Sequence, residues 1–380
     1  MIVLGNQLVL QFNIGDKTDF LEIEDFHYMR IAENAGGLRP IIDLSFQIND
    51  ESIIPYINSG NIITLMYGIK EPSSDILQFE IWGDDKTKDY RVGSTVNIGG
   101  AMYNRGFTSQ KKSRTFQNKK SFEALQSIAV QNNLKFVTNV TKTNDTQDWY
   151  QSGQTDWSMT NFIANRAYKS SETFFAYGFD NTNLYFYDIK EHLNSGIKWI
   201  LSVTSIADNE KSPVVNIGTY QTSDANAGIN AEFAGKNLTN VSYNVDTGEF
   251  ANPKYSLKSF TTLGTNSVNV NSDGCVNYNY QITSSDEHKF SIEAQNQNFR
   301  NNVLFSSYTC HVPVAGQYRD FKLFDVVQLI PAESDKEAEG IYFITGIAKE
   351  YKDNLYTTVL TLNRESPNGI RGNLEGGVNV

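Results

Sequence analysis

Three neighbouring stretches decide the fold of this chain: KSFEALQSIAVQNNL (120–134), TDWSMTNFIANRA (155–167) and TFFAYGFDNTNLYFYDI (173–189). In the first two, apolar residues recur every three or four positions, which is the spacing of an amphipathic helix. The third holds two aromatic runs around the turn formers Asp-Asn-Thr-Asn, a pattern typical of a β-hairpin. The centre of the chain is therefore predicted to be two helices followed by a hairpin.

The ends of both helices can also be predicted. Ser121 is the expected N-cap of the first helix and places Glu123 in its first turn. The first helix should end at Asn132-Asn133, and the second should begin at Thr155 or Asp156.

Both sides of this centre favour β-strands. Before it, runs such as 8–12, 41–46 and 62–67 alternate with Asn, Asp and Gly turns, a spacing typical of a small antiparallel barrel or sandwich. After it, the clearest strands are expected at 321–330, 341–348 and 355–362. The predicted fold class is α+β, mainly β, with a β-barrel region on each side of a smaller helix-plus-hairpin domain. The expected domains are 1–108, 109–196 and 197–365, with an insertion near 245–305 and a tail at 366–380.

Composition excludes several classes of protein. The chain has 43 acidic and 32 basic side chains, so its net charge is −11, which disfavours nonspecific binding to nucleic acid. Hydrophobic residues make up 39% of it, enough for packed cores. Its most apolar stretch, 62–67, is far shorter than the roughly 20 residues of a membrane-spanning helix. No signal peptide is expected, and Cys275 and Cys310 are expected to be reduced thiols.

No motif for catalysis or metal binding stands out. The four histidines, His27, His192, His288 and His311, lack ligand neighbours at zinc-site spacings. Cys310 and His311 are adjacent, so on a strand they would point to opposite faces. The chain also lacks a nucleophile elbow, a Walker loop and a dinucleotide fingerprint. We therefore expect no catalytic residue, no metal and no cofactor.

Three weaker candidates for chemistry each have a structural explanation that is favoured. Glu22 and Glu24 could form a carboxylate pair, but alternation along a solvated strand explains them as well. Trp149 and Trp157 could stack on sugars, although core or interface anchors are commoner. A basic stretch could bind phosphate or an acidic partner, or be a solvated connector; it comprises Arg105, Lys111, Lys112, Arg114, Lys119 and Lys120.

The central stretches resemble the central hub proteins of phage tail baseplates and the hub portion of the type VI secretion spike protein. In that family a KSxxEALxxIA helix precedes a TDWxFxxxLAxRA segment and an aromatic hairpin. Residues 308–329 look like a further strand pair of the family, with Phe324-Asp325 in place of its Gly-Asp. Residues 340–348 and 356–364 are similar to its last two strands. The resemblance covers about residues 60–365.

The resemblance implies two tube-like antiparallel β-barrel domains and no enzymatic activity. It implies a homotrimer, in which three chains form a pseudo-sixfold ring that joins a sixfold tail tube or distal tail protein to a threefold spike or tail tip. DNA would pass through the ring without specific binding, and acidic side chains along the bore would repel it. Edge strands of neighbouring subunits would pair to close the ring. The expected location is the phage virion, after assembly in the host cytoplasm.

The resemblance also bears on the C-terminal tail. Some family members continue into a spike or a cell-wall hydrolase domain, whereas here a separate spike protein is expected. We expect the tail 366–380 to contact that spike, through Leu374, Val378 and Val380.

Two alternative functions stay open. The first is the hub of a contractile injection or type VI secretion apparatus. The second is a β-rich tail enzyme or binding protein for glycans, which would require a pair of catalytic carboxylates.

Overall fold

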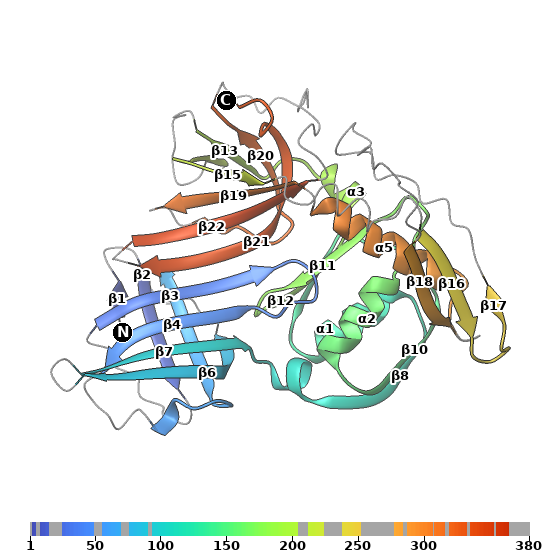
Figure 1. Cartoon of the computed structure of the whole chain (residues 1–380), viewed down its shortest axis with the longest axis horizontal. Helices are drawn as coiled ribbons and strands as arrows, with labels where there is room; N and C mark the ends of the chain where they lie inside the picture. Colours follow the sequence, from blue (N-terminus) through green and yellow to red (C-terminus); the bar gives the residue numbers. More distant parts are fainter. Residues whose placement is uncertain are drawn as a thin grey trace.

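The structure is a computed structural model that describes residues 2–4, 8–14, 25–48, 55–69, 76–89, 93–203, 212–223, 238–251, 277–283, 287–306, 308–315, 319–332, 335–352 and 355–364. The fold is α+β and mainly β, which confirms the predicted class. Figure 1 shows a large sheet beside a layer of helices and small sheets. Within the described ranges, no helix is both long and apolar enough to cross a membrane.

The large sheet, called here the composite sheet, has 14 strands. Its first half comes from the N-terminal part of the chain and is antiparallel throughout. In spatial order its seven strands are β1 (Ile2–Leu4), β2 (Leu8–Ile14), β5 (Ile62–Ile69), β6 (Leu77–Asp89), β7 (Gly93–Met102), β4 (Ile41–Ile48) and β3 (Asp25–Asn34). Alternation produces the core, because Ile42, Leu44 and Phe46 of β4 are buried while Asp43 and Ser45 face the other way.

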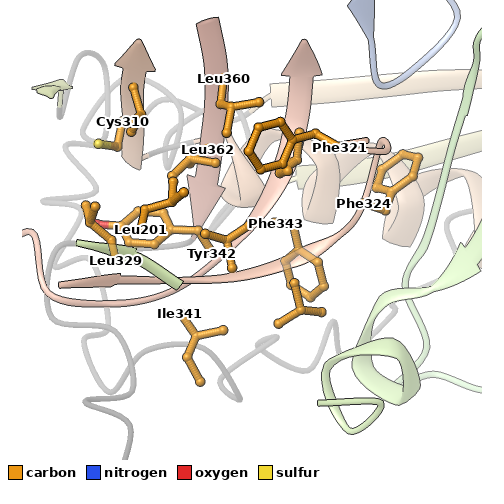
Figure 2. Close-up of a cluster of buried hydrophobic side chains, with 14 of the residues drawn as sticks. Leu201, Cys310, Phe321, Phe324, Leu329, Ile341, Tyr342, Phe343, Leu360 and Leu362 are labelled. Atoms are coloured by element: carbon orange, nitrogen blue, oxygen red, sulfur yellow. The ribbon is translucent and has the colours of Figure 1, made fainter. Parts of the chain in front are cut away.

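The second half of the composite sheet comes from the C-terminal part of the chain. Its seven strands are β13 (Trp199–Ser202), β14 (Val214–Asn216), β15 (Gln221–Ser223), β19 (Tyr308–Ala315), β20 (Val326–Ile330), β21 (Gly340–Lys352) and β22 (Leu355–Arg364). The hairpin of β21 and β22 lies at its centre. Figure 2 shows how Leu201, Leu329, Tyr342 and Leu362 pack together in the core of this half.

The two halves meet along β21. One edge of β21 pairs with β22 from Phe343 to Lys352. The opposite edge pairs with β20 up to Phe343 and then with β3, in a register that runs from Gly346↔Asn34 to Lys352↔Tyr28. A single backbone hydrogen-bond ladder therefore joins the N-terminal and C-terminal parts of the chain.

The change of partner falls at Thr345. Its carbonyl oxygen accepts the backbone N–H of Ala35 at 2.7 Å. The β21–β22 register also shifts between Ile344 and Gly346, which is the irregularity of a bulge. At this bulge, one edge of β21 stops pairing with β20 and begins to pair with β3.

The helical layer follows the predicted order. It contains a π-helix (Arg105–Ser109), β8 (Lys111–Lys119), α1 (Ser121–Gln131), β9 (Lys135–Thr138), β10 (Gln147–Thr155), α2 (Asp156–Arg166), β11 (Phe175–Phe179), β12 (Asn183–Asp188) and α3 (Ile189–Leu193). The predicted hairpin is β11–β12, and β9 pairs with β12 in parallel. The side chain of Asp180 accepts the backbone N–H groups of Thr182 and Asn183 and so fixes the hairpin turn.

Two expectations about local structure were wrong. Ser121 is the first helical residue and Lys120 is the N-cap, because the backbone N–H of Ser121 bonds to the buried carboxylate of Asp145 at 3.0 Å. The strand expected from residue 321 begins only at Val326. A turn precedes it, in which Phe324 has a φ of 68°.

The region near 245–305, expected to be an insertion, forms two separate structures. Residues 238–251 and 277–283 make a three-stranded sheet of β16 (Leu238–Asn244), β17 (Phe250–Ala251) and β18 (Asn277–Thr283). Helix α5 (Ser291–Phe305) then packs on α2, where the Asn298 amide donates to the carbonyl oxygens of Asn165 and Ala167, both at 3.1 Å. A strand-like run at 267–271, also expected from the sequence, lies outside the described residues. The domain limits given above remain predictions.

We predict that Gly346→Ala destabilises the protein. An added Cβ would lie 2.9 Å from Oδ1 of Asn34 and 3.0 Å from Cβ of Thr361. Such crowding costs about 1–3 kcal/mol in the free energy of unfolding, measured by urea titration. The control is Gly83→Ala in β6, where an added Cβ meets nothing within 4 Å. Equal losses in the two variants would contradict the prediction.

Candidate assembly surface

One face of the composite sheet carries polar and small side chains, and we call it the outer face. Successive residues of a strand point to opposite faces of the sheet. The residues next to each buried core residue in the chain therefore lie on the outer face. Its exposed or half-buried members include Tyr28, Arg30, Asp43, Ser45, Glu80, Thr95, Asn97, His311, Pro313, Ala315, Glu350, Lys352, Thr357, Val359 and Thr361. A face of this composition suits contact with solvent or with a polar partner better than a protein core.

A row of charged side chains crosses the outer face where the two halves join. Arg30 of β3 lies between Asp43 of β4 and Glu350 of β21. Its Nε is 3.1 Å from Oε1 of Glu350, and its Nη1 is 3.9 Å from Oδ2 of Asp43. The side chains are 33–41% exposed, so each ion pair contributes little stability. The row nevertheless pairs charges across the join.

Trp82 is the large aromatic residue of this region. It lies at the irregularity of β6 between Ile81 and Gly83 and is 56% exposed. A Cβ added at Gly99 of β7 would come within 2.6 Å of the Trp82 Nε1, so the indole lies directly over that glycine. An exposed tryptophan held in this way is a typical anchor of a protein–protein interface.

The described side chains of the outer face are nearly balanced in charge. Among its described side chains, Arg30 and Lys352 oppose Asp43, Glu80 and Glu350. The excess of acidic residues in the chain is therefore not concentrated on the described part of this face.

The basic stretch is part of a strand and a buried charge network. Two of its side chains, Lys112 and Arg114, contact the fully buried Asp156 at the start of α2, at 2.6 Å and 2.5 Å. The amides of Asn132 and Gln151 donate to the same carboxylate at 2.7 Å and 2.8 Å. Because both side chains are held by the buried Asp156 carboxylate, Lys112 and Arg114 are poor candidates for phosphate binding.

The pKa of Asp156 reflects this network. Burial acts to raise it, but the hydrogen bonds from Asn132, Lys112 and Gln151 and the charge of Arg114 bring the pKa below its ordinary value. The carboxylate therefore stays ionised and ties α2 to β8 and α1.

The two candidate tryptophans are anchors within the fold. Trp149 is fully buried in the helical layer, and its Nε1–H donates to the carbonyl oxygen of Lys119 at 2.8 Å. Trp157 of α2 donates from Nε1 to the carbonyl oxygen of Gly37 at 3.0 Å, and the guanidinium of Arg39 lies 5.3 Å from its ring centroid. Trp157 thus connects the helical layer to the turn between β3 and β4.

The histidines do not form a common site. Burial lowers the pKa of His192, whose Nε2 lies 2.9 Å from the carbonyl oxygen of Phe324. Burial also lowers the pKa of His288, whose Nε2 lies 3.1 Å from the carbonyl oxygen of Arg166. His27 and His311 are exposed. In the ranges that the structure covers, no group of three potential metal ligands occurs.

The other candidate residues fall into two groups. Cys310 is buried, and burial raises its pKa to about 12, which makes the thiol unreactive. The remaining candidates, Glu22, Glu24, Cys275, Leu374, Val378 and Val380, lie outside the described residues.

The sequence did not reveal an ion pair on the inner side of the sheet, where β3 pairs with β21. Oε1 of Glu33 on β3 lies 3.6 Å from Nζ of Lys349 on β21. Burial raises the pKa of Glu33, and Lys349 opposes that rise. No local signal reveals this pair, because the two residues become neighbours only through the β3–β21 register.

We predict that Asp156→Asn destabilises the protein at neutral pH. Removing one member of a buried charge network costs about 3 kcal/mol in the free energy of unfolding. Because the folded-state pKa is lowered, the wild-type advantage is present above the ordinary aspartate pKa and is lost as the pH falls through the folded-state value. Urea unfolding at pH 7 and pH 3 measures both effects. Asp148→Asn is the control, and a difference between wild type and Asp156→Asn that does not change with pH would contradict the prediction.

We also predict that Trp157→Phe weakens the attachment of the helical layer. It removes the hydrogen bond to Gly37 and costs about 1–2 kcal/mol in the free energy of unfolding. Trp82→Phe, at an exposed position, should change it by no more than about 0.5 kcal/mol. Equal losses in the two variants would argue against the anchoring role of Trp157.

We compared the chain with known families, curated proteins and solved structures over its whole length. No known family model and no curated protein matches it. Two solved structures are similar in fold. A tail protein from Neisseria meningitidis MC58 has a TM-score of 0.58 at 13% identity, covering 94% of this chain and 97% of that one. The 43 kDa tail protein of prophage MuSo2 from Shewanella oneidensis has a TM-score of 0.56 at 12% identity, covering 96% and 100%.

A third solved structure is less similar. The E. coli c3393 protein, described as a component of the type VI secretion system, has a TM-score of 0.49 at 12% identity and is covered over 79% of its length. At these identities the likeness is one of fold. The chain therefore has the fold of phage tail proteins over almost its whole length, in agreement with the resemblance found in its sequence.

Proposed function

We propose that this protein is the structural hub of a phage tail baseplate. Three copies would form a pseudo-sixfold ring between the sixfold tail tube and a threefold spike or tail tip. The observation that carries the proposal is the composite sheet, in which β3 and β21 join two halves of seven strands each. A chain with two comparable β regions supplies six such regions per trimer, and this is what a match between sixfold and threefold partners requires.

The free edges of the composite sheet favour a ring. Residues 83–89 of β6 pair with β7 alone, and residues 312–315 of β19 pair with β22 alone, counting only strands in the described ranges. Unpaired strand edges readily add another strand. In the proposed ring, the β6 edge of one copy meets the β19 edge of the next, and Trp82 lies beside this contact.

The outer face would line the central channel. Its small side chains and paired charges offer DNA few cations to bind, so DNA would slide past it. Repulsion of DNA by acidic side chains along the bore stays a prediction.

The alternative functions have weaker support. A hub of a contractile injection or type VI secretion apparatus would use the same ring, and the fold does not separate it from a phage hub. For a glycan-cleaving enzyme, the best-buried carboxylates, Asp145 and Asp156, bind backbone N–H groups and side chains that hold the fold together. The likeness to tail proteins along the whole chain favours a structural protein over an enzyme.

Native mass spectrometry of the purified chain, followed by negative-stain imaging, tests the proposal. A chain of 42.8 kDa should give a trimer of 3 × 42.8 = 128.4 kDa, seen as a threefold ring with a central opening. The same measurement is then made with the tail's spike protein present. A chain that stays monomeric in both conditions would contradict the hub function.

A further inference from the structure

Charge is unevenly distributed along the chain. Residues 104–151 contain eight basic and three acidic side chains, a net charge of +5 in a protein whose total is −11. Lys112 and Arg114 of this segment contact the buried Asp156, whose one negative charge offsets one of their two positive charges. The remaining positive charge is therefore available at the surface of the helical layer.

Part of this charge lies on a two-stranded ribbon formed by β8 and β10. Along β8, the inward side chains include Phe116, while every alternate residue from Lys111 to Lys119 is exposed. Tyr150 of β10 pairs with Thr115 at the middle of the ribbon and is 52% exposed. The outward face of the ribbon thus presents an aromatic ring between two lysines. Among the described side chains, neither Lys111 nor Lys119 forms an ion pair.

A second exposed surface has the opposite charge. The hairpin of β16 and β17 pairs Tyr243 with Phe250, whose ring centroids are 4.8 Å apart. Phe250 is 75% exposed, and the adjoining turn exposes Asp246 and Glu249. The turn is held by its own hydrogen bonds: the Asn244 carbonyl oxygen accepts the Gly248 N–H at 2.9 Å, and the Asn244 N–H donates to the Glu249 carbonyl oxygen at 2.9 Å.

The ribbon and the hairpin are complementary in their aromatic side chains and in their charges. Each presents an exposed aromatic ring, and lysines on one meet carboxylates on the other. A turn held by its own hydrogen bonds loses little entropy on docking. Figure 1 shows the three-stranded sheet of β16, β17 and β18 and the β8–β10 ribbon as separate outer parts of the molecule, on the side away from the composite sheet.

We infer that the β16–β17 hairpin of one copy docks on the β8–β10 ribbon of a neighbouring copy. Different surfaces of identical chains then meet, which is the heterologous contact from which closed rings are built. The inference rests on the proposed function, because it adds a second, peripheral contact to a ring of three copies.

Charge reversal tests the contact. The ribbon variant carries Lys111→Glu and Lys119→Glu, and the hairpin variant carries Asp246→Lys and Glu249→Lys. Each should raise the concentration at which trimers dissociate by about tenfold or more at low salt, and the variant with all four changes should recover most of the loss. Lys135→Glu with Lys142→Glu makes the same charge change at exposed positions outside the ribbon and should have little effect.

Disulfide trapping provides a readout that does not depend on these charges. In a Cys275→Ser background, Thr115→Cys on the ribbon and Thr247→Cys on the hairpin turn should form bonds between chains and give a trimer on a nonreducing denaturing gel. Thr95→Cys on the outer face, combined with Thr247→Cys, is the control and should leave monomers.

The outcomes separate the two proposals. A wild-type trimer whose charge variants dissociate like wild type, and which gives no cross-linked trimer, overturns the contact and leaves the hub function intact. A wild-type chain that never trimerises overturns both. A ribbon variant that keeps its trimer but loses another tail protein overturns the contact and assigns the ribbon to that protein.

Discussion

The backbone pairing of β3 with β21 is the constraint on which the rest of the structure depends. It converts two sequence-distant β regions into one sheet, and it aligns their outer faces so that Arg30 can lie between Asp43 and Glu350. The same register brings Glu33 beside Lys349 on the opposite side of the join. Without this ladder, the backbone hydrogen bonds that set the relative orientation of the two halves would be lost.

The helical layer is attached to the sheet by polar contacts as well as by packing. Asp156 gathers two cations and two amides at the start of α2, and Trp157, the next residue, reaches the turn beyond β3. Two adjacent residues of one helix therefore organise the layer internally and fix it to the sheet. The Thr-Asp-Trp segment at the start of α2 therefore has a structural role in this fold.

Much of the fold could be predicted because its signals are local. Apolar periodicity reveals α1 and α2, and the turn formers at 180–183 reveal the β11–β12 hairpin. The β3–β21 join has no such signal, since backbone pairing leaves no mark in either strand alone. The turn before β20 could not be predicted from the sequence either, because Phe324 has a left-handed backbone conformation that usually favours glycine. Its buried ring, packed near Tyr185 and Tyr187, offsets that strain.

The position of β21 in the chain also determines when the protein can finish folding. Asn34 and its partner Gly346 lie 312 residues apart, so a ribosome makes β3 long before β21 exists. Closing so long a loop is slow, and the edge of β3 that will pair with β21 lacks that partner while synthesis continues. An unpaired edge of this kind can recruit strands from other nascent chains. The yield of correctly folded protein should therefore depend on how quickly synthesis reaches the C-terminal hairpin, and a cell that makes many copies at once is most exposed to misassembly.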